Sequence, residues 1–323
     1  MKYSFIIPVY NAANTIGRCI ESILGNTFND FEILLIDDCS KDESLKICRD
    51  YEQKYHQIRV FHNEVNQGVS HTRNVGLEHT EGEYLLFTDS DDWIEKNYIE
   101  SFEQALKIND LFAVCGFYNH DEKYNGRLDT YQWKDINGIQ SVKLHDYMED
   151  MFQRTLLQQL WNKAFKNDIV KKNNIRFDES ISIGEDFRFI LSYLKTADVK
   201  DMVIINEPLY HYMRDQAGSL MFHVGYESIE EPLKNKRMYY ALLGKNEDEI
   251  DHLMAEERTK QEDLYAYLIM HNGDMALKEK KRLVLNLSET RGKELYRHHY
   301  ILCYKEQISR ILKKMISCIK RSS

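Results

Sequence analysis

The sequence predicts an α/β protein with a mixed, mostly parallel sheet flanked by helices and a helical C-terminal extension. In the first hundred residues, short apolar runs alternate with helical patterns, as expected for parallel strands joined by helical crossovers. Beyond residue 225 the chain becomes rich in Glu, Lys, Leu and Tyr, with helical patterning. We therefore expect three regions, residues 1–110, 111–224 and 225–323.

Composition limits the function classes. With 43% hydrophobic and 29% charged residues, the 323-residue chain is typical of soluble globular proteins. A formal net charge of -9 argues against a nucleic-acid partner. No apolar run approaches the roughly 18–20 residues of a membrane span, and the N-terminus lacks signal-peptide features. Six cysteines without a Cys-x-x-Cys pair indicate neither a zinc site nor a disulfide framework. A cytoplasmic location is expected.

The first elements follow from apolar patterning. Buried strands, read as short apolar runs between polar residues, are expected at 3–9, 31–36, 58–61 and 84–88. Helices are expected from residue 14 or 15 to about 24, and at 40–55, 69–77 and 98–108. Ser40 is the expected N-cap of the second helix. A further strand at 112–118 precedes a polar loop or hairpin at 119–140.

An acidic stretch follows the fourth strand. Asp89, Asp91 and Asp92 lie within four positions, directly after an apolar run. Close carboxylates repel one another unless a cation sits between them. One or two carboxylates, with positions left for water and phosphates, suit a magnesium-type ion. The alternative is an acidic turn in which Asp91 or Asp92 caps the next helix.

Three strands end in polar loops that we expect to meet at one edge of the sheet. These loops contain Tyr10-Asn11, Asp37-Asp38 and Asp89-Ser90-Asp91. Ligands of open α/β sheets bind at this edge. A glycine-containing helix entry at 66–74 carries Arg73, and a helix start with a guanidinium suits a diphosphate. The alternative is that Arg73 pairs with a local carboxylate.

Four segments, 5–11, 36–42, 66–77 and 82–93, resemble the motif series of family 2 glycosyltransferases in order and spacing. Cys39 stands where that pattern commonly has glycine. The resemblance implies a GT-A fold, with a nucleotide-sugar-binding half at 1–110 and an acceptor-binding half at 111–224.

The resemblance also implies roles for residues in these motifs. The base is expected near Pro8, Tyr10 and Asn11, with Asp38 bonding its edge. Arg73 is expected to face the nucleotide and Asp89 the ribose, with Ser90 also on the nucleotide-sugar side. Asp91 is expected to bind a divalent metal, Mn²⁺ or Mg²⁺, that bridges the diphosphate. Asp92 either supports that metal or caps a helix.

The acceptor side is expected further along the chain. By the resemblance, Asp186 is the general base, with Glu185 orienting it or contacting the acceptor. Only one carboxylate is needed there, because the metal stabilises the leaving group. The alternative is that both acids merely favour a helix N-terminus. Trp161 either stacks on an acceptor sugar or belongs to the core. Arg214 or His211 is expected near the diphosphate.

The last residues form a basic amphipathic pattern. Apolar side chains recur at helical spacing over residues 304–321, with Lys and Arg at most other positions. Such a helix suits an anionic membrane surface, here the inner face of the cell membrane. A helix packed on the body or on a second subunit of an oligomer would show the same stripe, and both interpretations stay open.

The resemblance implies an inverting, metal-dependent transferase. It would move a sugar from a nucleoside-diphosphate sugar, expected to be a UDP-hexose or UDP-N-acetylhexosamine, to a carbohydrate hydroxyl. The expected acceptor is a glycan, lipid-linked glycan or glycoprotein of the bacterial surface. A sugar-phosphate nucleotidyltransferase is a rival, but residues 11–14 lack the glycine-rich, arginine-containing loop it needs. A non-catalytic sugar-binding or scaffolding subunit is disfavoured by Asp89, Asp91 and Asp186 together.

Overall fold

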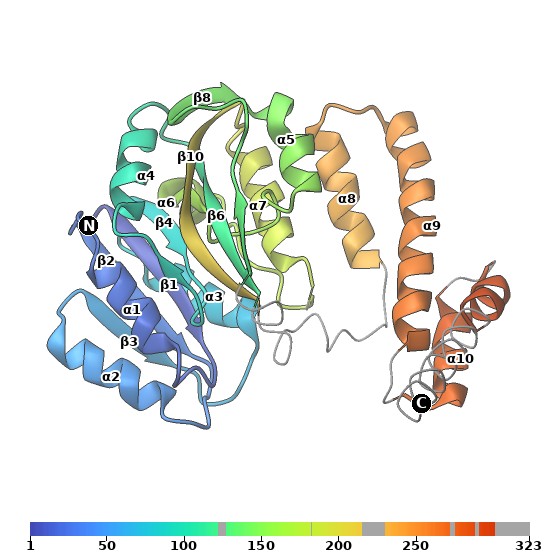
Figure 1. Ribbon diagram of the computed structural model, residues 1–323, viewed down its shortest axis with the longest axis horizontal. Helices are drawn as coiled ribbons and strands as arrows, with labels where there is room; N and C mark the ends of the chain where they lie inside the picture. The colour runs from blue at the N-terminus through green and yellow to red at the C-terminus, as the bar shows by residue number, and fades with distance from the viewer. Residues whose placement is uncertain (122–126, 182, 215–229, 272–274, 288–290, 301–323) are drawn as a thin grey trace, which may run out of the picture. The chain divides into compact units, whose positions relative to one another are not determined.

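The computed structural model describes residues 1–121, 127–181, 183–214, 230–271, 275–287 and 291–300. The chain forms two compact units, residues 1–222 and 223–323 (Figure 1). The predicted amphipathic run at 304–321 lies outside the described residues.

Four parallel strands form one side of the sheet in the first unit. Their order is β3 (Ile58–His62), β2 (Phe31–Asp37), β1 (Tyr3–Val9) and β4 (Tyr84–Phe87). All three neighbouring pairs are parallel. Every residue of β2 is buried, because helices cover both faces of such a sheet. The predicted parallel arrangement is confirmed.

The crossover helices are α1 (Ile16–Leu24), α2 (Ser44–Lys54) and α3 (Val69–His79). A Cβ added at Gly76 would lie 2.5 Å from a methyl carbon of Ile6, so this glycine lets α3 approach β1 closely. The expected start of α2 was wrong, because the N-cap is Glu43 rather than Ser40.

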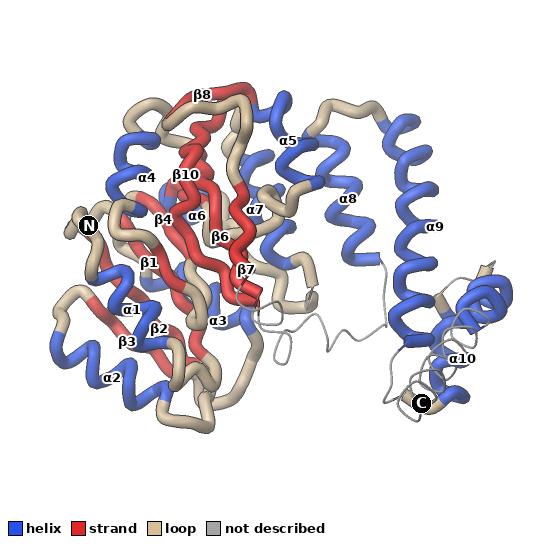
Figure 2. Tube along the Cα trace, viewed as in Figure 1, coloured by secondary structure: helices blue, strands red, loops and turns tan. Residues whose placement is uncertain are grey.

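The remaining strands complete a mixed sheet, shown in Figure 2 with helices on either side. Strand β9 (Lys163–Lys166) lies antiparallel between β4 and β6 (Phe112–Asp121). Strand β10 (Asp201–Arg214) then runs parallel to β6 and antiparallel to β5 (Trp93–Ile94). The predicted halves 1–110 and 111–224 thus share one sheet, and their separate roles remain a prediction.

Shorter elements fill the rest of this unit. Strands β7 (Arg127–Tyr131) and β8 (Ile139–Lys143) pair with β6 and β10. The helices are α4 (Tyr98–Leu106), α5 (Leu144–Gln153), α6 (Asn167–Lys172) and α7 (Glu185–Thr196). The N-cap position of α4 is Asn97, so the alternative in which Asp91 or Asp92 caps this helix is wrong.

The second unit is helical where it is described. It contains α8 (Glu230–Leu242), α9 (Glu247–His271) and α10 (Leu277–Asn286). Val284 and Leu295 pack with apolar residues of α9 in a small core. The predicted fold class, including a helical C-terminal extension, is confirmed. Within the described parts of the chain, no helix is both long and apolar enough to cross a membrane.

Candidate active site

The loops after β1 and β2 are joined by hydrogen bonds. The Asn11 amide donates to the Ser40 hydroxyl at 3.0 Å, and the Asn11 side chain accepts from the Lys41 amide at 2.7 Å. Asn11 and Cys39 have φ angles of 51° and 61°. Glycine adopts this left-handed region most readily, which accounts for the glycine common at the position of Cys39. Two of the three predicted strand ends therefore meet.

The Asp38 side chain forms hydrogen bonds to the loop that leads into α3. Its carboxylate accepts the amides of Gln67 and Gly68 at 2.9 and 2.8 Å, and the Asn63 side-chain amide at 2.9 Å. The residue is only 4% exposed. A carboxylate offers about four lone-pair sites, so these contacts leave little capacity for a base. Shaping the loop at 66–68 is the role this geometry gives to Asp38.

Arg73 joins carboxylates from the two sides of the predicted site. It donates to Asp186 at 2.7 Å and to Asp89 at 3.1 Å, and its guanidinium lies 3.5 Å from Glu185. Its ring neighbour is Phe177, 5.5 Å from the guanidinium carbon. Burial acts to lower the pKa of Arg73, but Asp186, Asp89 and Glu185 outweigh it and raise that pKa. The guanidinium therefore stays positively charged. The carboxylates that it contacts are the expected ribose ligand, Asp89, and the expected acceptor-side acids, Asp186 and Glu185.

Asn74 forms hydrogen bonds to residues 177 and 179, in the segment that precedes Asp186. Its amide donates to the Phe177 carbonyl at 2.9 Å and to Glu179 at 2.8 Å, while its oxygen accepts the Phe177 amide at 2.9 Å. The neighbours Arg73 and Asn74 thus tie α3 to the segment preceding α7. A short motif on one helix therefore positions residues more than 100 positions further along the chain.

Asp186 lies in the first turn of α7, after Gly184 in the left-handed conformation. Its side chain is 22% exposed, so a small ligand can reach it. Burial raises the pKa of Asp186 to about 8. The positive charge of Arg73 acts to lower this pKa, whereas the negative charges of Glu185 and Asp89 act to raise it. A raised pKa makes a carboxylate a better proton acceptor near neutral pH.

Asp92 occupies a structural position. It is fully buried, and its two oxygens accept from the Tyr210 hydroxyl at 2.6 Å and the Met213 amide at 2.7 Å. Burial raises the pKa of Asp92, with further contributions from Asp91 and Asp89. Tyr210 also accepts the Asp89 amide at 3.1 Å. Because protein groups occupy both oxygens, the geometry does not fit the predicted role of Asp92 as a metal ligand.

Asp89, Ser90 and Asp91 are partly exposed in the loop after β4. Arg18 of α1 donates to the Asp91 carbonyl, which fixes the backbone of this loop. No cluster of three or more His, Cys, Asp or Glu that could hold a metal occurs among the described residues. The donor set therefore fits only an ion that takes most of its ligands from water and phosphate.

A stack of rings supports the same loop from the other side. Arg18 lies over Trp93 at 4.0 Å, Trp93 stacks on His211 at 4.7 Å, and His211 stacks on Tyr118 at 4.6 Å. His211 is also bonded to Glu95 at 2.9 Å. Since these contacts hold the ring of His211 in place, it serves the loop around Asp91. Its predicted contact with a diphosphate remains untested.

Trp161 belongs to the core. It is 2% exposed and stacks on Tyr210 at 4.3 Å and Tyr212 at 5.4 Å. Phe117 packs against it edge-on at 4.8 Å. A buried ring cannot stack on a sugar, so the structure favours the core alternative over the predicted acceptor contact.

The other predicted positions lie at the surface. Tyr10 is 49% exposed and Pro8 is partly buried, which leaves the Tyr10 ring accessible to a base. Arg214 is exposed at the end of β10, directly before residues outside the description.

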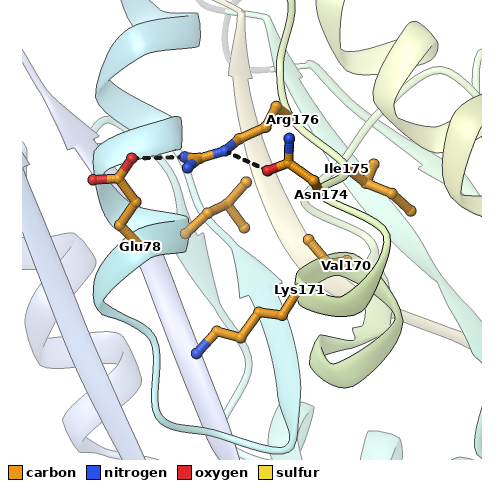
Figure 3. Close-up of a pocket in the computed structure, with 7 residues that line it drawn as sticks. Glu78, Val170, Lys171, Asn174, Ile175 and Arg176 are labelled. Atoms are coloured by element: carbon orange, nitrogen blue, oxygen red, sulfur yellow. Dashed lines mark hydrogen bonds and ion pairs between the residues drawn. The ribbon is translucent and has the colours of Figure 1, made fainter.

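A pocket of about 330 Å³ lies elsewhere, between α3 and the segment around α6 (Figure 3). Arg176 there pairs with Glu78 at 2.9 Å and bonds Asn174 at 3.4 Å. None of the predicted site residues lines it.

Sequence reasoning missed several residues that support the site. Trp93 ends a recognised segment and Tyr210 is the neighbour of His211, but nothing in their spacing shows that Trp93 contacts Arg18 or that Tyr210 contacts Asp92. Lys163 was also missed, because it opens its strand directly after the polar Asn162, and nothing in that pattern shows that the side chain is fully buried.

The fold and the carboxylates at its strand ends define the GT-A class. The profile described as glycosyl transferase family 2 matches residues 4–172, and the chain belongs to this family. It is 31% identical over 221 residues to "Uncharacterized glycosyltransferase EpsJ" of Bacillus subtilis (strain 168), covering 67% of this chain and 62% of that protein. It is 28% identical over 316 residues to "Minor teichoic acid biosynthesis protein GgaB" of the same organism, covering 96% and 32%.

Solved structures share the fold. The structure of S. aureus TarS 1–349 in complex with UDP-GlcNAc aligns with a TM-score of 0.63 at 20% identity, covering 96% of this chain and 92% of that one. At this identity the likeness supports the fold alone. The chain spans less than two thirds of the length of EpsJ and about one third of GgaB.

Proposed function

We propose that this protein is an inverting, metal-dependent glycosyltransferase that moves a sugar from a UDP-sugar to a carbohydrate hydroxyl. The observation that carries the proposal is the bridge from Asp89 through Arg73 to Asp186. It brings the expected ribose ligand and the expected base to one guanidinium. Such a site can hold donor and acceptor together, as transfer requires.

The donor half of the proposal rests on the strand ends. Tyr10 offers an exposed ring to a base, and Asn11 closes the loop beside it. Asp38 contributes by shaping the 66–68 loop. Asp89 would accept from a ribose hydroxyl, for which its partly exposed carboxylate has capacity beyond the Arg73 contact.

Asp91 would hold the divalent metal, Mn²⁺ or Mg²⁺. When held there, a divalent ion would supply stabilisation of the negative charge that develops on the leaving oxygen, without proton transfer. The chain's own contribution is a fixed loop, held by Arg18 at the Asp91 carbonyl and by Tyr210 at Asp92. Preorganisation of this kind lowers the cost of stabilising charge as it develops.

Asp186 would take the proton from the attacking hydroxyl. An inverting transfer needs one base on the acceptor side, and the raised pKa of Asp186 suits that role. Arg73 occupies one oxygen of this carboxylate. We infer that a bound diphosphate would compete for Arg73 and free this oxygen for the acceptor, while Glu185 keeps the guanidinium nearby.

The biological setting is inferred from relatives. GgaB carries minor teichoic acid biosynthesis in its name, and a protein of Bacillus spizizenii (strain ATCC 23059 / NRRL B-14472 / W23) that is 31% identical over 233 residues is named poly(ribitol-phosphate) beta-glucosyltransferase. These names support an acceptor among bacterial surface polysaccharides or glycans. The acceptor itself would be a glycan, lipid-linked glycan or glycoprotein.

Nucleotide release tests the proposal. UDP-, GDP- and dTDP-sugars would be mixed with the protein, Mn²⁺ and candidate glycan acceptors, and free nucleotide measured. Release of UDP with formation of glycosylated product supports a transferase. Pyrophosphate release from UTP and a sugar phosphate would identify a nucleotidyltransferase instead. Thermal stabilisation by UDP-sugars without turnover under any condition would favour a non-catalytic subunit.

The location at the membrane is a separate proposal. The basic run at 304–321 would attach the protein peripherally to the inner face of the cell membrane. Packing on the body or on a second subunit is its rival, and truncation separates the two as set out in the Discussion.

A further inference from the structure

Two histidines form a hydrogen-bonded pair beside the loop that carries Asp91. The Nε2 atom of His120, on β6, lies 2.9 Å from the Nδ1 atom of His211, on β10. The Nε2 atom of His211 lies 2.9 Å from a carboxylate oxygen of Glu95, which directly follows β5. Both imidazole rings lie 4.7 Å from the ring of Trp93. The proposed function uses neither imidazole of this histidine pair.

The hydrogen bonds fix where the ring protons of the pair lie. An ionised carboxylate only accepts, so the Nε2 atom of His211 carries the hydrogen that bonds to Glu95. A neutral imidazole has one N–H, and its other nitrogen is an acceptor. The Nδ1 atom of His211 therefore accepts the hydrogen that the Nε2 atom of His120 donates. The pair can take up one proton in this arrangement, whereas a second would set two N–H groups against each other at 2.9 Å.

The surroundings favour the neutral pair. Burial lowers the pKa of His120, and the charges of His211 and Arg18 act in the same direction. Burial and the charge of Arg18 also lower the pKa of His211, although its bond to Glu95 acts to raise that pKa. Asp129 of β7 pairs with the residue before His120, so its side chain belongs to the other face of β6. At neutral pH both rings are therefore uncharged.

Trp93 and Arg18 connect the pair to the Asp91 loop. The guanidinium of Arg18 lies over the Trp93 ring at 4.0 Å and donates to the Asp91 carbonyl. His211 stacks on the same ring at 4.7 Å and an angle of 10°. A positive charge on the pair would repel Arg18 where this arginine contacts the loop. Because coupling between two sites is reciprocal, a proton that Arg18 disfavours must in turn weaken the position of Arg18.

We propose that the histidine pair is an acid-sensitive brace for the Asp91 loop, which holds Trp93 and Arg18 in place while both imidazoles are neutral and loosens the loop when it takes up a proton. This inference rests on the proposed function, in which the loop holds the divalent ion. A free histidine titrates near pH 6.5, and the pair takes its proton below that value. Affinity for UDP with Mn²⁺ should fall there by about tenfold, which corresponds to a coupling of about one pKa unit.

Calorimetry with UDP and Mn²⁺ near pH 7.5 and near pH 5.5 tests the proposal in His120→Phe. The phenyl ring can pack against Trp93 but takes up no proton, and a proton on His211 would then leave an N–H without an acceptor. The matched control is His145→Phe on the exposed face of α5. The pH dependence of UDP and Mn²⁺ themselves is common to all three proteins.

The expected result is a difference in the pH effect. Between the two pH values, the affinity of wild type and of His145→Phe should fall about tenfold more than that of His120→Phe. An equal fall in all three proteins would overturn the proposal, because a residue that only packs changes the affinity by the same factor at both pH values. Thermal unfolding at each pH establishes that the variants are folded.

Titration of the imidazole signals by NMR does not depend on ligand binding. The signals of His120 and His211, assigned by their loss in His120→Phe and His211→Phe, are followed in wild type and in Arg18→Gln. Midpoints below about 6.5 that rise in Arg18→Gln support the coupling, since the opposing charge is gone. Midpoints that stay unchanged in Arg18→Gln refute it. If wild type binds no nucleotide at any pH, the proposed function is wrong, and this titration still tests the coupling of the pair to Arg18.

Discussion

Arg73 on α3 and Asp186 on α7 are joined by a hydrogen bond of 2.7 Å across 113 positions of sequence. The same guanidinium holds Asp89 at 3.1 Å. The donor and acceptor sides of the proposed site are therefore linked through one side chain. Arg73 thus pairs with carboxylates, as in the alternative interpretation, and its predicted contact with the nucleotide stays a prediction.

Asp91→Ala is expected to abolish transfer and most of the metal-dependent affinity for UDP. The reason is that Asp91 is the partly exposed carboxylate proposed to hold the divalent ion. Calorimetry with and without Mn²⁺ measures the affinity, with Asp50→Ala on the surface of α2 as control. Unchanged metal-dependent binding in Asp91→Ala would refute this assignment.

Asp92→Asn is expected to lower the free energy of unfolding by about 1–3 kcal/mol, the cost of leaving a buried polar group unsatisfied. An amide nitrogen would face either the Met213 amide or the Tyr210 hydroxyl, which now donate to the carboxylate. UDP affinity with Mn²⁺ should stay within a few-fold of wild type. Urea denaturation and calorimetry check the two parts. Loss of metal-dependent binding in a folded variant would restore Asp92 as a metal ligand.

Asp186→Asn is expected to lower turnover by roughly 10²–10⁴-fold, the contribution of general-base catalysis. The amide keeps the shape of the side chain but cannot take a proton. Donor affinity should remain near wild type, because Asp89 and Asp91 are intact. Steady-state kinetics with a saturating acceptor measures the loss. Glu185→Gln is the comparison, and a larger loss there would move the base to Glu185.

The kcat/KM of the wild-type protein is expected to rise with pH and reach half its plateau near pH 8. Asp186 must be ionised to accept a proton, and its pKa is raised to about 8. Below that value activity should fall by about tenfold per pH unit, since one protonation removes the base. The residual activity of Asp186→Asn should lack this limb. A limb that persists unchanged in the variant would assign the ionisation to another group.

Removal of residues 304–323 is expected to abolish co-sedimentation with vesicles containing phosphatidylglycerol and to leave turnover on a soluble acceptor nearly intact. Each Lys or Arg near an anionic surface contributes about 1 kcal/mol, and the apolar stripe adds burial in the acyl boundary. High salt should weaken binding by the full-length chain. A truncated protein that binds vesicles as well as the intact one would exclude the membrane role. Lost thermal stability or a changed oligomer size would indicate packing on protein.

The sequence by itself determined the parallel part of the sheet and the positions of its polar strand ends. Runs such as Phe31–Asp37 are mostly apolar, and the alternation of such runs with helical patterns leaves few arrangements other than parallel strands. Local patterning thus sufficed to place Asn11, Asp38 and Asp89 at loops after strands. Which polar group each of these side chains would bond was not encoded locally.

Only the tertiary structure decided which of the predicted residues remain accessible. Asp92 directly follows the partly exposed Asp91, and Trp161 was a candidate acceptor contact, but packing against β10 buries both. Insertion of β9 between β4 and β6 brings Lys163 to the edge that carries the site. The physical reason is that hydrophobic spacing specifies an element and its buried face, whereas strand pairing and the satisfaction of buried polar groups depend on segments distant in sequence.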